Sequence, residues 1–81
     1  MRKYNGKSNV CGEIVEKTRL AKNMSREDLA KKLQLAGLNV DRTHILRIEK
    51  GKVIVKDFEL LIICNVLDIN YTSLQSELEK N

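Results

Sequence analysis

Apolar side chains recur every three or four residues along most of the chain, a spacing typical of amphipathic helices. The first such segment covers residues 10–23, with Cys11, Val15 and Thr18 on one face. Proline is absent and only four glycines interrupt the pattern, so the composition favours helices over sheets. The sequence therefore predicts an all-α protein with five helices.

Ser25 is expected to begin the second helix. Its hydroxyl can accept a hydrogen bond from a first-turn amide while Asp28, three residues later, reaches back in a capping box. Gly37 follows the last periodic positions and is suited to a left-handed residue that ends the helix near Ala36. The buried stripe of this helix is expected to be Leu29, Ala30 and Leu33.

A short third helix is predicted over about residues 41–50. Asp41 can cap its start and Gly51 can end it, while Ile45 and Ile48 point inward. The remaining surface is largely polar and basic, and it carries Arg42, Thr43, His44, Leu46 and Arg47.

The fourth predicted helix covers residues 57–67 and is apolar almost all round. Its core face is expected to be Leu60, Ile63, Cys64 and Leu67. Because Leu61 and Ile62 place further apolar side chains elsewhere on its surface, this helix should either be the most buried element or contact another subunit.

Two further segments complete the helical region. Residues 52–56 are largely β-branched and flanked by lysines, and we expect them to form a connector because no partner strand is predicted. Asn70 can cap a fifth helix that contains Leu74 and Leu78.

The first nine residues differ from the rest of the chain. They are polar, lack a period and contain Arg2, Lys3 and Lys7, so residues 1–9 are predicted to be a flexible basic arm before a domain of residues 10–81. A basic arm of this kind can lie along a nucleic-acid duplex, or it can simply be disordered.

The 81 residues, 42% of them hydrophobic, suffice for one compact domain. A domain of this size depends on well-packed helices or on a partner subunit, which is consistent with a homodimer. Charge is uneven: residues 1–56 hold fourteen of the fifteen Lys and Arg residues, whereas residues 57–81 hold one base and five acids. A basic region of this kind, residues 1–56, is suited to binding a polyanion on one face of the protein.

Several classes of protein are disfavoured. Cys11 and Cys64 form no CxxC motif and no signal peptide is evident, which predicts a cytoplasmic protein without disulfides. The longest apolar run, residues 60–64, is far shorter than the ~20 residues of a membrane span. His44 is the only other usual soft metal ligand, and no phosphate loop or paired catalytic carboxylate motif occurs. We therefore expect no enzymatic activity, metal or cofactor.

Three segments, SREDLAKKL, VDRTHILRIEKGK and the later VLDI, resemble the lambda-repressor-like or Xre-type helix-turn-helix family. The resemblance covers roughly residues 10–78 and rests on the combination of a capped serine, a Leu-Ala pair and an Ile-x-x-Ile-Glu-x-Gly ending. It implies a compact five-helix DNA-binding domain. The segment QLAGL adds about five residues to the family pattern, so we expect an extended turn between the second and third helices.

A short helix with a polar, basic first turn fits the major groove, where side chains reach base edges. The expected base contacts are Arg42, Thr43, Leu46 and Arg47, with His44 as a further possible contact. Arginine can bind a guanine edge through two hydrogen bonds, and leucine can touch a thymine methyl. The alternative is a solvated polar face, and His44 could instead tuck against the second helix.

Phosphate contacts are expected from Arg26, Lys50, Lys52 and Lys56, although each lysine could instead serve solubility. The resemblance also implies a partly buried ion pair between Arg19 and Glu49, which ties the first helix to the end of the recognition helix.

These features predict a repressor-like regulator that binds double-stranded operator DNA as a homodimer. The dimer contacts are expected among Leu61, Ile62, Tyr71, Leu74 and Leu78. The alternative is an antitoxin-like protein-interaction module on the same scaffold, with weak DNA binding and a partner on its acidic, apolar rear. The sequence specifies neither an operator nor a small-molecule effector.

Overall fold

The computed structural model describes residues 8–9 and 11–70, which contain helices, turns and loops but no strand. The all-α prediction is confirmed. The four helices of this part are α1 (Gly12–Ala21), α2 (Arg26–Leu35), α3 (Arg42–Glu49) and α4 (Asp57–Leu67). The five-helix count is not matched, because the helix expected after Asn70 lies outside the described residues.

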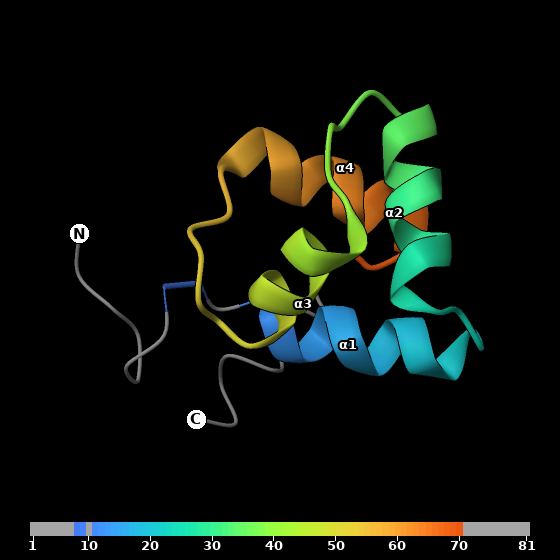
Figure 1. The fold of residues 1–81 in the computed structure, drawn as a ribbon, viewed down its shortest axis with the longest axis horizontal. Coiled ribbons are helices and arrows are strands. Elements are labelled where there is room, and N and C mark those ends of the chain that lie inside the picture. Colours follow the sequence, from blue (N-terminus) through green and yellow to red (C-terminus); the bar gives the residue numbers. More distant parts are fainter. Residues whose placement is uncertain (1–7, 10, 71–81) are drawn as a thin grey trace.

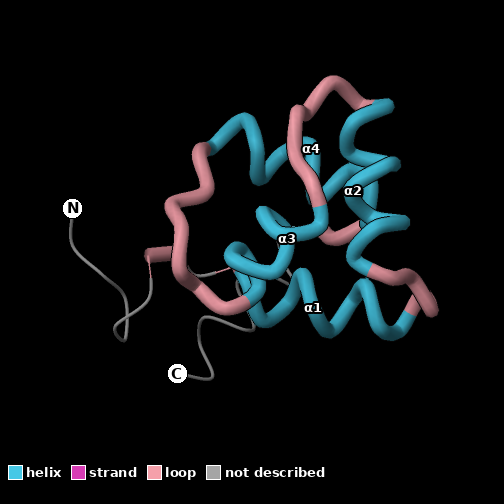
Figure 2. The backbone as a smooth tube through the Cα atoms, in the orientation of Figure 1, coloured by secondary structure: helices cyan, strands magenta, loops and turns pink. Residues whose placement is uncertain are grey.

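The four helices enclose one core (Figures 1 and 2). α2 packs against α3 and α4, and α1 packs against the same two helices. The largest fully buried side chains come from all four helices, and they are Val15, Leu29, Leu33, Ile45, Ile63 and Leu67. The inward positions predicted for α2 and α3 are therefore the ones that fill the core.

The start of α2 forms the predicted capping box. The Ser25 hydroxyl accepts from the Asp28 amide at 3.0 Å, and Asp28 Oδ2 accepts from the Ser25 amide at 3.0 Å. The hydrogen bonds from the Ser25 backbone and side chain hold the pKa of Asp28 below its usual value. Asp41 caps α3 in a similar way, because its Oδ1 accepts from the His44 amide at 2.8 Å.

Two helices end at glycines in the left-handed region, as predicted. Gly37 (φ 96°) follows α2, and the Leu38 amide reaches back to the Leu33 carbonyl at 2.9 Å. Gly51 (φ 70°) follows α3, and here the Lys52 amide donates to the Arg47 carbonyl at 2.8 Å. These bonds satisfy carbonyls that the last helical turn leaves without a partner.

The longer connection between α2 and α3 is anchored at both of its sides. Gln34 Nε2 donates to the Val40 carbonyl at 2.6 Å, and the side chains of Leu38 and Val40 are buried in the core. Leu35, at the last turn of α2, is 90% exposed. The inserted residues therefore extend the turn without separating α2 from α3.

The boundary between arm and domain lies earlier than the sequence indicates. Asn9, which the sequence assigns to the flexible arm, is buried. Its Nδ2 donates to the carbonyls of Ile48 (3.1 Å) and Val53 (2.9 Å), and its Oδ1 accepts from the Gly12 amide (2.9 Å). Asn9 thus belongs to the folded domain, whereas residues 1–7 of the expected arm lie outside the described residues.

α4 is less buried than its apolar sequence implied. Ile63 and Leu67 are buried, but Leu60 and Cys64, also expected in the core, are only partly buried. Other apolar side chains face outward: Phe58 is 51% and Leu61 54% exposed. α4 is therefore not the most buried element, and it carries an exposed apolar face.

Candidate nucleic-acid interface

α3 has one buried side and one exposed side, as a helix with about 100° between successive side chains dictates. Ile45, Ile48 and Glu49 form the buried side. The exposed side carries Arg42, Thr43, Leu46 and Arg47, the four side chains expected to contact bases. His44 lies at the edge and is half-buried, in a hollow that Gln34 and Asn39 also line.

The two arginines of this exposed side are not paired with any described residue. Neither Arg42 nor Arg47 forms a side-chain hydrogen bond or ion pair within the part of the chain that the structure describes. The acid of α3, Glu49, is buried, and the Asp41 carboxylate accepts from a backbone amide at the start of the helix. The exposed side of α3 is therefore positively charged and open to a ligand.

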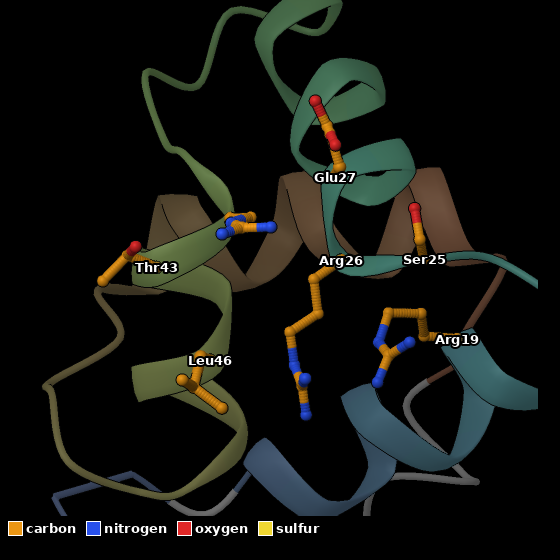
Figure 3. A pocket seen from close by; sticks show the side chains of 7 residues that line it. Arg19, Ser25, Arg26, Glu27, Thr43 and Leu46 are labelled. Carbon is orange, nitrogen blue, oxygen red and sulfur yellow. The ribbon is translucent and has the colours of Figure 1, made fainter.

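A hollow of about 480 Å³ separates the start of α2 from α3 (Figure 3). Arg26 lines it from α2, and Arg42, Thr43 and Leu46 line it from α3. The Glu27 side chain of α2 points away from Arg26 (Figure 3). The hollow thus has arginines on both of its sides, with Glu27 as the acid in its lining.

Arg19 and Glu49 lie together in the interior, as the family resemblance implied. Arg19 Nε lies 2.7 Å from Glu49 Oε2, and Arg19 Nη2 donates to Oε1 at 3.3 Å. Arg19 Nη1 donates to the Met24 carbonyl at 2.8 Å, and the Glu49 side chain is 0% exposed. This buried pair holds the end of α3 against α1.

Arg26, expected as a phosphate contact, has acidic partners of its own. Its Nε donates to Glu49 Oε1 at 2.8 Å, and its Nη2 lies 3.2 Å from Oε2 of Glu16 in α1. Sequence reasoning missed Glu16, because no local pattern shows which acid of α1 faces α2. Arg26 thus differs from Arg42 and Arg47, which have no such partners among the described residues.

The three lysines expected at phosphates are all exposed, but their surroundings differ. Lys50 and Lys52 lie at the end of α3, where the Lys52 amide donates to the Arg47 carbonyl at 2.8 Å. Lys56 Nζ lies 6.0 Å from the centroid of the Phe58 ring. Lys56 therefore lies beside the exposed ring of Phe58 at the start of α4.

The two cysteines are held in their neutral form. Burial raises the pKa of the Cys11 thiol to about 11 and also raises the pKa of the Cys64 thiol. A thiol that stays protonated at neutral pH is a weak nucleophile. No group of three or more His, Cys, Asp or Glu side chains gathers as a metal site in the described residues.

The comparisons bear on the whole of this arrangement. A family model described as Helix-turn-helix matches residues 15–74, a range that runs from α1 past the end of α4. No curated protein and no solved structure matches the chain. Among the described helices, none is long and apolar enough to cross a membrane.

Proposed function

The chain belongs to the lambda-repressor-like, Xre-type helix-turn-helix family, and from this premise we propose that it is a cytoplasmic regulator that recognises a specific operator sequence. α3 enters the major groove. Arg42 and Arg47 bind guanine edges, Thr43 offers a hydroxyl or a methyl, and Leu46 packs against a thymine methyl. His44, at the edge of the same helix, contacts a phosphate or a base.

The observation that carries this proposal is the freedom of Arg42 and Arg47. Most guanidinium groups with an acid in reach form ion pairs, as Arg19 and Arg26 do. Two arginines on one exposed helix side, neither of them in an ion pair with a described residue, are arranged for an external anion. Lys50, Lys52 and Lys56 add phosphate contacts that orient the domain on the duplex.

The proposal includes a homodimer that uses the exposed apolar side of α4. Phe58 and Leu61, three residues apart, lie on this side, and Ile62 packs against the core. Ile54 of the preceding loop is a further exposed apolar side chain. Leu61 was expected among the dimer contacts, whereas Phe58 and Ile54 were not. Tyr71, Leu74 and Leu78 lie outside the described residues. Two recognition helices about 34 Å apart would read two half-sites, and the bound dimer would repress by occupying the operator.

Selection from random duplexes tests the DNA proposal. The wild-type protein should enrich one sequence with two related half-sites, and Arg42→Ala should relax the preference at one base position. Enrichment of no sequence by folded protein would contradict the proposal. If Arg42→Ala lost affinity equally for every duplex, Arg42 would contact phosphates and not bases.

Sedimentation tests the dimer. Leu61→Asp should give a monomer with weaker operator binding, because one half-site alone supplies half the contacts. Leu20→Asp is the matched control, since Leu20 in α1 is 59% exposed and lies outside the proposed interface. A dimer that survives Leu61→Asp would exclude this side of α4.

A second candidate function is an antitoxin-like interaction module, and the acids around the apolar side of α4 favour it. Asp57 and Glu59 flank Phe58, so the surface would suit a basic, apolar partner. This candidate predicts weak DNA binding at physiological salt and loss of partner binding by Leu61→Asp. Tight operator binding by the isolated protein would exclude it as the primary role.

A further inference from the structure

Arg26 holds two acids that belong to different helices and different environments. Its Nε donates to Glu49 of α3 at 2.8 Å, and that carboxylate is 0% exposed. Its Nη2 lies 3.2 Å from Glu16 of α1, and both of these side chains are about one-third exposed, at 33% and 32%. One side of the guanidinium is therefore fixed in the interior while the other side faces solvent.

The two contacts differ in how readily they break. Separating Arg26 from Glu49 would remove one donor from a fully buried carboxylate, which is costly. Separating Arg26 from Glu16 only returns an already hydrated carboxylate to water, and exposed ion pairs of this kind contribute little. An incoming anion would therefore replace Glu16 and leave the contact with Glu49 in place.

Arg26 also lies where such an anion would arrive. It lines the hollow that Arg42 and Thr43 line from the exposed side of α3 (Figure 3). We propose that Glu16 occupies, in the free protein, the place on Arg26 that a DNA backbone phosphate takes in the complex. This inference rests on the proposed function.

The exchange makes Arg26 a positioning residue. A phosphate bound at Nη2 would be linked to Glu49 through the planar guanidinium of Arg26. Because Glu49 lies at the end of α3, both the contact with the DNA backbone and the position of the recognition helix would depend on this one side chain. Glu16 lowers DNA affinity, because its contact must be given up and its charge is repelled by the duplex. This effect is the same on every base sequence, since phosphates carry no sequence information.

A double-mutant cycle tests the exchange. Glu16→Gln should raise affinity for specific and random duplexes about two- to fivefold at low salt, the range that loss of one exposed ion pair allows. In an Arg26→Gln background the gain from Glu16→Gln should fall to that of an exposed carboxylate, because only the repulsion between Glu16 and the duplex is then removed. Glu27→Gln is the matched control, because Glu27 lines the same hollow without an ion pair to Arg26. Its smaller effect should persist in both backgrounds.

The outcomes separate the two proposals. Folded wild-type protein that binds no duplex overturns the proposed function and this inference with it. Wild-type binding with equal effects of Glu16→Gln and Glu27→Gln overturns only the exchange, as does a Glu16→Gln effect that is undiminished in the Arg26→Gln background. Guanidinium NMR of the wild type checks it without any variant: adding duplex should shift the Nη signals of Arg26 while its Nε–H remains bonded. Unchanged Nη signals would contradict the exchange.

Discussion

The Glu49 carboxylate lies 2.7 Å from Nε of Arg19, and the pair is almost completely removed from solvent. Glu49→Gln should lower the free energy of unfolding by about 3–5 kcal/mol, because it leaves the guanidinium of Arg19 buried without its counterion. Urea denaturation measures this loss. Glu27→Gln removes the same charge from an exposed position and should change stability by less than about 0.5 kcal/mol. Equal losses in the two variants would show that the buried pair has no special weight.

Gly12 allows α1 to approach the end of α3. A Cβ at this position would collide with the Ile48 carbonyl oxygen and lie 2.9 Å from that of Glu49. Gly12→Ala gains about 1 kcal/mol in helix propensity, but displacing two backbone carbonyls costs more, so we expect a net loss of about 1–3 kcal/mol. Thermal unfolding checks this. Leu20→Ala, at an exposed position of the same helix, is the control, and an equally stable Gly12→Ala protein would contradict the contact.

Asn9 should be sensitive to the loss of its donor as well as to truncation. Asn9→Ala removes the donor to the Val53 carbonyl, the acceptor of the Gly12 amide and one of two donors to the Ile48 carbonyl, at a cost of about 1–3 kcal/mol. Asn9→Asp should be worse, because a carboxylate oxygen would then face both carbonyls. Chemical denaturation of the two variants gives the order. A more stable Asp variant would show that the contact with the Gly12 amide dominates.

Lys52 and Arg47 should respond differently to salt and to base sequence. Lys52→Ala should weaken binding to all duplexes and reduce the slope of log affinity against log salt by about 1. Arg47→Ala should cost about 1–3 kcal/mol on the operator and relax the preference at one base pair. Salt titrations on operator and random DNA measure both. An unchanged slope would remove Lys52 from the phosphate contacts.

Cys11 should make the fold less stable at alkaline pH. Burial raises the pKa of its thiol from 9.0 to about 11, so the folded protein keeps a proton that the unfolded chain loses above pH 9. The stabilisation is present below pH 9 and declines as the pH rises to 11, by about 2–3 kcal/mol in total. Denaturation of wild type and Cys11→Ala across this window isolates the effect. A constant stability difference would contradict it.

Local chemistry explains what could be predicted from the sequence. The capping box at Ser25 and the glycine endings at Gly37 and Gly51 depend on residues within one or two turns of each other, and the structure has them where the spacing placed them. The inward positions of α2 and α3 follow from helical periodicity in the same way. The ends and the core faces of α2 and α3 could therefore be predicted from the sequence.

Contacts between segments far apart in the sequence could not be predicted from the spacing of residue types. Asn9 looked like part of a polar arm, because its partner Ile48 lies 39 residues away. Arg26 looked free at a helix start until α1 placed Glu16 beside it. α4 is apolar almost all round, so the packing of α1 and α2, and not the periodicity, decides that Phe58 stays exposed. Periodicity tells which side of a helix is apolar but not which neighbour covers it.

The Ser8 amide donates to the Gly51 carbonyl at 2.8 Å, so the chain enters the domain beside the loop that carries Lys52. A fluorophore attached at a cysteine introduced for Ser8 would therefore sit at the edge of the recognition helix. Quenching of this fluorophore by a quencher attached to one end of a duplex would report the orientation in which the protein binds DNA.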